Sequence, residues 1–251
     1  ISLRLVGSEM CIRDRIIFPL VKKLMSFKTV YIASFLGYAT HGLLDACTSY
    51  GTLLFWPFSN ERITWNNISI VDPLFTIPVL ILVGVAVKTK KRIYSFFSIG
   101  WVIFYLSLGL IQYERALSAA NDLAESRGHN PERLTLKPSF GNLILWKSIY
   151  QNEQTFYVDA IRTVQSSIVC SGESIEIFDY QQHLPGLDKE SQQAEDVERF
   201  RWFSQDYLGF DKEKKLVTDV RYSMLPNQIE PMWGLIINCL LYTSPSPRDE
   251  D

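Results

Sequence analysis

The sequence predicts an α-helical membrane bundle of about three transmembrane helices, followed by a small soluble α+β domain. Two observations support this fold class. Residues 16–113 consist of apolar runs separated by short basic clusters, whereas residues 114–238 have the mixed composition of a water-soluble domain. The 251 residues, 47% of them hydrophobic, are enough for a folded core. A formal net charge of −2 argues against a dedicated nucleic-acid-binding protein.

Three apolar segments predict the membrane helices. Ile93–Tyr113 carries no charge over 21 residues, which at about 1.5 Å per residue span the hydrocarbon core of a bilayer. Thr29–Leu44 and Pro73–Val87 are shorter, and each taken alone is also typical of a buried helix in a soluble domain. We assign them to the membrane because basic clusters at residues 22–28 and 88–92 flank the segments.

The same basic clusters predict the orientation, since positively charged loops stay in the cytoplasm. The first helix then runs outward to about Asp45, residues 46–72 form an outer loop, and the third helix leads outward again. We therefore expect a multi-pass protein of the bacterial inner (plasma) membrane, with everything after Glu114 on the outer, periplasmic side.

The soluble half alternates between helix-like and strand-like segments. The expected helices are Glu114–Arg127 and Gln192–Tyr207. The expected strands are rich in β-branched and aromatic residues and comprise Leu143–Tyr150, Thr155–Val164, Ser174–Phe178 and Lys215–Met224.

The sequences at both ends of the chain indicate that these residues do not belong to the native protein. Leu5–Asp14 and Cys239–Asp249 can be encoded by opposite strands of one short DNA duplex, which resembles a transposon-type sequencing adapter. Such sequence carries no information about the fold. We expect residues 1–15 and 239–251 to be adapter-derived, and the chain between them to be part of a longer protein.

His41 and Asp45 are the first candidates for chemistry. Four residues apart on a helix, they project from one face, which is the spacing of two ligands of one metal ion. Asp72, before the next helix, is the candidate third ligand. An imidazole with carboxylates suits zinc, manganese or iron, and such an ion activates water as a Lewis acid.

The same residues allow a structural explanation. His41 and Asp45 can form a simple hydrogen-bonded pair, and Asp72 before Pro73 is an ordinary helix N-cap. The membrane context favours a functional role, because ionisable groups at helix ends in an apolar bundle are costly.

A longer pattern surrounds these residues. It reads H-x3-D-x2-T-x-YGT, then PFS-x2-R, then a D-P pair that opens a helix, and is formed by His41, Asp45, Thr48, Tyr50, Gly51, Thr52, Pro57, Phe58, Ser59, Arg62, Asp72 and Pro73. Two further runs follow at Pro138–Trp146 and Asp219–Pro226. The pattern resembles the family of inner-membrane, metal-dependent hydrolases described as LexA-regulated or membrane-bound. The resemblance covers about residues 16–238 and is sharpest over residues 41–73.

This resemblance implies metal-dependent hydrolysis, with His41 and Asp45 as catalytic metal ligands and Asp72 as a third ligand. The H-x3-D element is also similar to one in zinc-dependent phospholipases C and related nucleases. Family members usually carry an upstream His-Arg and Thr-His segment, which does not occur between Arg15 and Thr40. We therefore expect an incomplete metal site, weak metal affinity and little activity.

Other candidate residues have less specific patterns. Arg62 is a candidate for binding a substrate phosphate or lipid headgroup, or for pairing with a local carboxylate. His129 and His183 lie in polar turns, where we expect solvent-exposed side chains. Asp219 and Arg221 are two apart on a predicted strand, so we expect a local ion pair with a structural role.

Together these features predict a membrane-bound hydrolase that holds a divalent metal ion, with zinc the expected metal. It would cleave an ester or phosphodiester near the membrane surface. The expected partners are the lipid bilayer and a lipid or lipid-linked substrate, and no nucleic acid. Two alternatives stay open: an ion- or proton-coupled transporter, and a non-catalytic membrane scaffold.

Overall fold

The computed structural model describes residues 26–185 and 190–237. The adapter-derived ends expected at residues 1–15 and 239–251 lie outside the described residues, as does the start of the first basic cluster. The chain divides between Trp65 and Asn66 into two compact units, which we describe separately.

The first unit contains helix α2, Phe27–Ala46, and the loop that follows it. Ser26 begins the helix as N-cap, since its hydroxyl accepts a hydrogen bond from the backbone N–H of Thr29 at 3.3 Å. In the loop, the backbone groups of Thr52 and Ile63 pair in an isolated bridge. The N–H of Trp65 donates to the carbonyl of Ala46 at 2.7 Å, which returns the loop to the end of α2.

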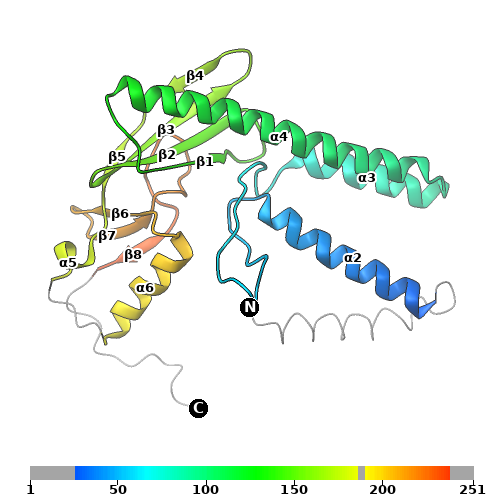
Figure 1. Ribbon diagram of the computed structural model, residues 1–251, viewed down its shortest axis with the longest axis horizontal. Helices are drawn as coiled ribbons and strands as arrows, with labels where there is room; N and C mark the ends of the chain where they lie inside the picture. Colours follow the sequence, from blue (N-terminus) through cyan, green and yellow to red (C-terminus); the bar gives the residue numbers. More distant parts are fainter. Residues whose placement is uncertain (1–25, 186–189, 238–251) are drawn as a thin grey trace. The chain divides into compact units, whose positions relative to one another are not determined.

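The second unit begins with a hairpin of two apolar helices, α3, Pro73–Thr89, and α4, Ile93–Ser126 (Figure 1). Asp72 caps α3, with Pro73 as the first helical residue, as the structural explanation of that sequence predicted. The two helices lie side by side, and the rings of Phe75 and Tyr105 are 5.6 Å apart. Helix α4 also unites the two expected segments Ile93–Tyr113 and Glu114–Arg127.

A small residue allows close packing against α4. A Cβ atom added at Gly109 would overlap the backbone carbonyl of Asn67, so only glycine fits at this point of the helix. Asn67 itself is buried, and it lies in the segment that leads into α3. The segment before α3 therefore lies directly on the surface of α4.

The predicted bundle of three transmembrane helices is wrong. Within residues 26–185 and 190–237, only α4 is both long and apolar enough to cross a membrane. Helix α3 has 17 residues, about 25 Å at 1.5 Å per residue, which is less than the hydrocarbon core. Polar side chains such as Tyr38, Thr40 and His41 interrupt the apolar sequence of α2. Only 17% of the apolar window of α4 is buried, unlike the core helix of a soluble protein.

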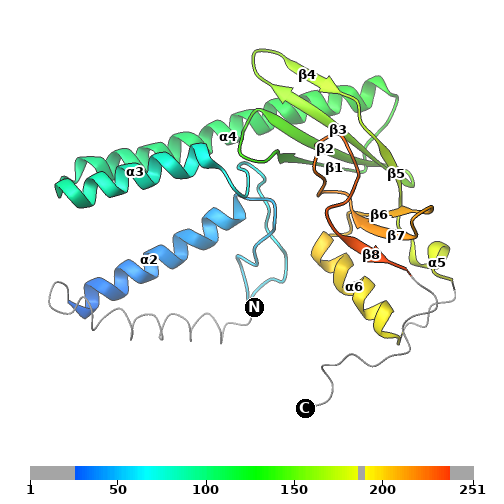
Figure 2. The same ribbon diagram turned by 180° about the vertical axis from the view of Figure 1, so that it is seen from behind.

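The expected small α+β domain is also wrong. The chain after α4 instead forms a sizeable, curled, eight-stranded antiparallel sheet (Figure 2). The strand order is β1-β2-β3-β5-β6-β7-β8, and β4 pairs with the free part of β3. The strands are β1 Arg133–Pro138, β2 Leu145–Asn152, β3 Thr155–Thr163, β4 Ser167–Cys170, β5 Ser174–Ile177, β6 Leu208–Asp211, β7 Leu216–Asp219 and β8 Gly234–Ile236. Two helices, α5 Tyr180–His183 and α6 Gln192–Ser204, connect β5 to β6.

Side chains alternate between the two faces of the first strands. On one face, Trp146 and Ile161 pack against Ala116 and Ala120 of α4. On the other face, the core is formed by Ile149, Phe156, Val158, Tyr207, Val220 and Ile229. A further core lies between α6 and strands β6 and β7.

A buried ion pair fixes the end of α4 on the sheet. The guanidinium of Arg127 donates two hydrogen bonds, of 2.7 and 2.8 Å, to the carboxylate of Asp159 on β3, and a third to the hydroxyl of Tyr150. The hydrogen bond to Asp159 raises the pKa of Arg127, against the lowering effect of burial. Helix α4 and the sheet are thus joined by directional contacts as well as by apolar packing.

Candidate functional site

His41 and Asp45 lie on the same face of α2, in its last two turns. The His41 Nε2 and Asp45 Oδ2 atoms are 3.4 Å apart, and the two side chains are 68% and 49% exposed. Two ligand atoms bound at about 2.0–2.2 Å to one tetrahedral ion are roughly 3.4 Å apart. The pair therefore has a suitable separation for two ligands of a single ion, and it is open to solvent.

Asp72 has other contacts in the structure. Its Oδ1 atom accepts hydrogen bonds from the backbone N–H groups of Leu74 and Phe75, at 3.0 and 3.2 Å. Its Oδ2 atom accepts a bond of 2.7 Å from the hydroxyl of Tyr105 on α4. The side chain is buried, so both carboxylate oxygens contribute to the start of α3 and to its packing on α4.

In the part of the chain that the structure describes, no group of three or more His, Cys, Asp or Glu side chains is arranged to hold a metal ion. The contacts shown for His41 and Asp45 supply two donors. A complete zinc site uses three or four protein ligands, so the pair is at most part of one.

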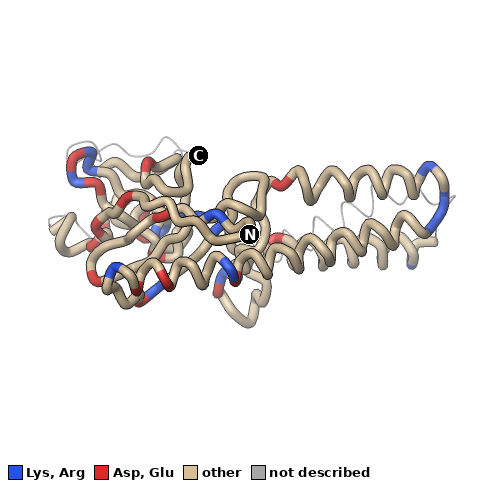
Figure 3. The backbone as a smooth tube through the Cα atoms, turned by 90° about the horizontal axis from the view of Figure 1, so that it is seen from above, with Lys and Arg blue, Asp and Glu red and all other residues tan. Residues whose placement is uncertain are grey.

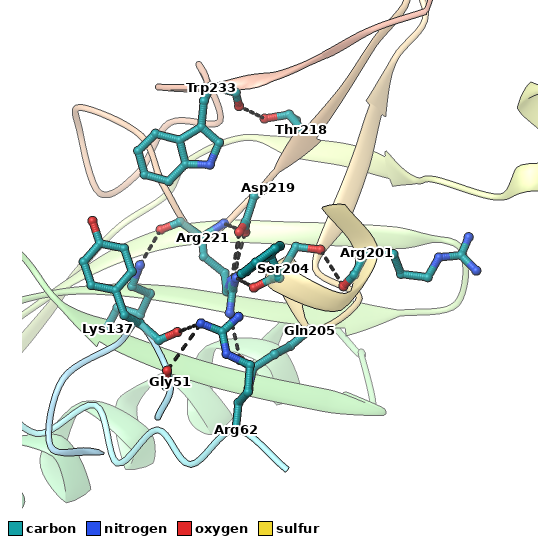
Figure 4. Close-up of polar contacts among 12 residues, drawn as sticks. Gly51, Arg62, Lys137, Arg201, Ser204, Gln205, Thr218, Asp219, Arg221 and Trp233 are labelled. Atoms are coloured by element: carbon teal, nitrogen blue, oxygen red, sulfur yellow. Dashed lines mark hydrogen bonds and ion pairs between the residues drawn. The ribbon is translucent and has the colours of Figure 1, made fainter. Parts of the chain in front are cut away.

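Arg62 binds backbone groups within its own loop. One guanidinium nitrogen donates to the carbonyl oxygens of Tyr50 and Gly51, at 2.5 and 3.3 Å (Figure 4). Gly51 has a φ of +82°, which favours glycine, and an added Cβ would press against Arg62. Arg62 thus stabilises the loop that follows α2, a role that the sequence did not suggest.

The two other histidines are packed against aromatic rings instead of being exposed turn residues as expected. His129 Nδ1 lies 2.9 Å from the hydroxyl of Tyr150, and its ring is 4.6 Å from that of Tyr157. The side chain of His183 is only 3% exposed and lies against Phe210, with ring centroids 4.3 Å apart.

Glu176 lies beside this second histidine. The His183 Nε2 atom is 3.4 Å from its carboxylate, which also pairs with Lys212 at 2.5 Å. The hydrogen bond from Lys212 lowers the pKa of Glu176. These contacts join α5 to β5 and to the turn after β6, which gives His183 a structural role.

Asp219 and Arg221 form the predicted ion pair, which is confirmed. The guanidinium nitrogens of Arg221 donate to both carboxylate oxygens of Asp219, the shortest contact being 2.7 Å (Figure 4). Arg221 also donates to the side-chain oxygen of Gln205 and to the carbonyl of Phe203, at 2.8 and 2.9 Å. The pair ties the end of β7 to the end of α6.

Two buried lysines next to this pair are absent from the sequence predictions. Lys137 on β1 and Lys147 on β2 are register partners, and they are only 6% and 5% exposed. The Lys137 Nζ donates to the carbonyl of Arg221 at 3.1 Å and lies 3.2 Å from the ring centre of Tyr222. Burial and the charge of Arg221 lower the pKa of Lys137 well below its ordinary value.

Lys147 contacts a serine. Its Nζ donates hydrogen bonds to the Ser223 hydroxyl at 2.6 Å and to the Gln228 carbonyl at 2.9 Å. Burial lowers its pKa to about 7, although the negative charges of Asp219 and Glu173 act in the opposite direction. The sequence held one signal of this arrangement, since Lys147 lies within a strand beside Trp146 and close to Ile149, where a polar side chain is unexpected.

Comparison with known proteins gives a match for the helical part of the chain. No curated protein and no solved structure matches the chain. Residues 12–116 match the model of the family described as YdjM inner membrane protein, and the match ends within α4, before the sheet begins. This match shows that the helical part of the chain is similar to an inner-membrane protein family. Helix α4, which is long and apolar enough to cross a membrane, is consistent with that similarity.

Proposed function

We propose that this protein is a membrane-anchored hydrolase in which His41 and Asp45 provide two ligands of a divalent metal ion, with zinc the expected metal. The single observation that carries the proposal is the 3.4 Å separation of the His41 Nε2 and Asp45 Oδ2 atoms on one exposed helix face. When bound, such an ion supplies a positive charge that polarises an ester or phosphodiester group and favours attack by water.

The chain's own residues would position that ion. The helical backbone of α2 keeps both side chains on one face, so neither has to be recruited from a distant segment. The remaining ligands must come from other residues, of which Asp72 is the candidate from the sequence. Because both oxygens of Asp72 already accept hydrogen bonds, we assign it first to the start of α3.

A lipid or lipid-linked ester is the proposed substrate. The pair lies at the end of a helix that exposes large apolar side chains, including Tyr31, Phe35 and Leu36. The match to an inner-membrane family supports action at a membrane.

We also propose that the sheet domain lies on the outer, periplasmic side. Lys88 in the last turn of α3, and Lys90, Lys91 and Arg92 in the connection that follows, lie at the end of α4 that is remote from the sheet (Figure 3). Basic residues next to a membrane-crossing helix stay in the cytoplasm. The other end of α4, with the sheet packed on it, would then be outside.

Metal analysis of the detergent-purified protein tests the metal proposal. We expect His41→Ala and Asp45→Asn to lower zinc content at least tenfold and to abolish hydrolysis of a short-chain phospholipid. Asp122→Asn, at an exposed position of α4, is the matched control and should retain both. Equal zinc content in all variants, or none in any, would overturn the proposal. A protein that binds zinc but hydrolyses no ester would instead fit a transporter.

Asp72→Asn tests the third ligand in the same experiment. The asparagine side-chain oxygen can still cap α3. A loss of zinc with unchanged thermal stability would assign Asp72 to the metal, whereas unchanged zinc content would restrict it to the helix cap.

A further inference from the structure

Ser223 lies at the surface of the sheet domain, in the segment that follows β7. Its backbone forms an isolated bridge with Pro231, and its hydroxyl donates a hydrogen bond of 2.7 Å to the carbonyl of Leu225. The residue is partly exposed, unlike the lysine behind it. A reagent in solution can therefore reach this serine from one side while Lys147 contacts it from the other.

Close packing holds this segment in place. A Cβ atom added at Gly172 would overlap the carbonyls of both Asn227 and Val158, so Gly172 lies in close contact with the loop beyond Ser223 and with β3. The backbone N–H of Ile229 donates to the carboxylate of Glu173 at 2.8 Å. The position of Ser223 relative to Lys147 is thus fixed by contacts on both sides of the loop.

Among the described residues, no carboxylate is hydrogen-bonded to the amine of Lys147. Lys137, the register partner of Lys147, has its own pKa lowered by burial and by the positive charge of Arg221. Asp219 is bound on both oxygens by Arg221, and Glu173 accepts from the backbone of Ile229. The two partners of the Lys147 Nζ are neutral oxygen atoms, from Ser223 and Gln228.

We propose that Ser223 and Lys147 form a nucleophile–base dyad that hydrolyses carboxylic esters with an apolar acyl chain. The Ser223 Oγ and the Lys147 Nζ lie 2.6 Å apart, so rotation of the hydroxyl from the Leu225 carbonyl toward the neutral amine gives its proton a direct path to Lys147. Serine activated by lysine is a known variant of the serine nucleophile. This activity is independent of the metal proposed for His41 and Asp45.

The reaction divides into two balanced steps. The Ser223 Oγ bonds to the ester carbonyl carbon while its proton passes to the neutral Nζ of Lys147. The bond from that carbon to the alcohol oxygen then breaks, and the Lys147 ammonium returns the proton to the leaving alcohol. In the second step, water attacks the acyl-serine, Lys147 accepts its proton, and the carboxylic acid leaves as the proton returns to the Ser223 Oγ.

A buried lysine suits this role because it can be neutral near physiological pH. Burial brings the pKa of Lys147 to about 7, so a large fraction of the amine is unprotonated at pH 7–8. A general base is most effective when its pKa lies near the working pH. An exposed lysine, with a pKa near 10.4, would be almost fully protonated.

The surroundings of Ser223 favour an apolar acyl group. Met224 and Leu225 follow it directly and are 79% and 51% exposed. Met232 and Trp233, which follow its bridge partner Pro231, are 54% and 41% exposed. Four exposed apolar side chains on two adjacent segments form an apolar surface beside the hydroxyl, which a fatty acyl chain can cover.

Labelling with an alkyl fluorophosphonate tests the dyad in the full-length, detergent-purified protein. The probe phosphorylates an activated serine with loss of fluoride, and peptide mass spectrometry identifies the modified residue. We expect the label on Ser223, at a rate that rises with pH through about 7 as Lys147 loses its proton. Labelling should be unchanged by EDTA, so a failure of the metal proposal would not affect this result.

Variants separate catalysis from structure. Ser223→Ala should abolish the label, whereas Ser167→Ala, at an exposed position of β4, should retain it. Lys147→Arg keeps a hydrogen-bond donor but removes the base, because its guanidinium stays protonated, and it should lower the labelling rate about 100-fold or more. Hydrolysis of p-nitrophenyl octanoate should exceed that of the acetate in kcat/KM and follow the same variants.

Labelling of the wild-type protein is sufficient to contradict the proposal. The test therefore does not depend on whether the Lys147 variant folds. Label on other serines, or no label on Ser223, would overturn it. A labelling rate on Ser223 that is flat between pH 6 and 9 would assign the Lys147 contact to structure only, and would also overturn it.

Discussion

At the scale of single residues, the main feature of this protein is a pair of lysines placed inside a sheet. Lys137 and Lys147 face each other on adjacent strands, with the pKa of both lowered by burial. Their partners are backbone carbonyls, a hydroxyl and the ring of Tyr222. The fold therefore favours the neutral amine over the ammonium, in contrast to an exposed lysine.

This burial predicts a dependence of stability on pH. In the unfolded chain Lys147 keeps its proton up to about pH 10.4, whereas in the fold it loses it near pH 7. Between these values the unfolded chain binds more protons, so the free energy of unfolding rises with pH, by up to about 1.4 kcal/mol per pH unit. Thermal unfolding in detergent between pH 6.5 and 9 measures this rise.

Replacing the lysine isolates its contribution. Lys147→Met should reduce the rise in melting temperature with pH. Part of the rise should remain, because burial also lowers the pKa of Lys137. Arg221 stays charged throughout this range, because its pKa is raised. Lys91→Met, at an exposed position in the turn before α4, should leave the slope as in the wild type. Identical slopes for the two variants would contradict the prediction.

Residue roles were predictable from the sequence where they depend on near neighbours. The N-cap at Asp72 and the ion pair of Asp219 with Arg221 each involve residues within three positions of one another. The Lys147 contact with Ser223 joins residues 76 positions apart, and it exists only because the sheet curls. His183 was misjudged because its polar turn folds back onto Phe210, which follows later in the chain.

At the scale of elements, α4 is the part on which the second unit is built. It contacts α3 along its first part and strands β1, β3 and β4 along its last part. Two small residues, Ala116 and Ala120, are fully buried against the sheet, and Gly109 lies against the segment before α3. Close packing of backbone on backbone thus requires small side chains at regular places on this helix.

Two glycines of α4 give a matched test of this packing. Gly109→Ala places a methyl group onto the Asn67 carbonyl and should destabilise the protein by about 1–3 kcal/mol. Gly100→Ala meets no atom within 4 Å and should leave stability unchanged or raise it slightly. Thermal unfolding of both variants in one detergent provides the comparison, and equal melting temperatures would contradict the close contact.

The sequence predicted most of the elements but missed four strands. Helices α2, α3 and α6 and strands β2, β3, β5 and β7 lie where we expected elements of the same kind. The missed strands are β1, with six residues, and β4, β6 and β8, whose four residues or fewer give alternation little length to show. Without them, the sheet was expected to be smaller than it is.

At the scale of the whole molecule, the match to an inner-membrane family and the apolar part of α4 lead to the same location. The number of membrane helices was overestimated, because two short apolar segments were assigned to the membrane from the basic residues that flank them. For the candidate sites, local spacing predicted the His41–Asp45 pair, but no spacing rule unites residues from different strands.

A native cysteine can test the proposed orientation. Cys170 is exposed on β4, within the sheet domain. In a variant with serine at the other cysteines, a membrane-impermeant maleimide should label Cys170 in intact spheroplasts. Labelling that requires disruption of the inner membrane would place the sheet in the cytoplasm and contradict the proposal.

Because α4 is one continuous helix, its length also determines the distance between its apolar part and the sheet domain. Its 34 residues extend about 50 Å, which exceeds the roughly 30 Å of a hydrocarbon core. The last turns of the helix pack on the strands and are held there by Arg127 and Asp159, so no flexible segment separates the sheet from α4. In the proposed orientation, the sheet would therefore reach only the aqueous layer next to the lipid, and molecules dissolved farther out in the periplasm would lie beyond it.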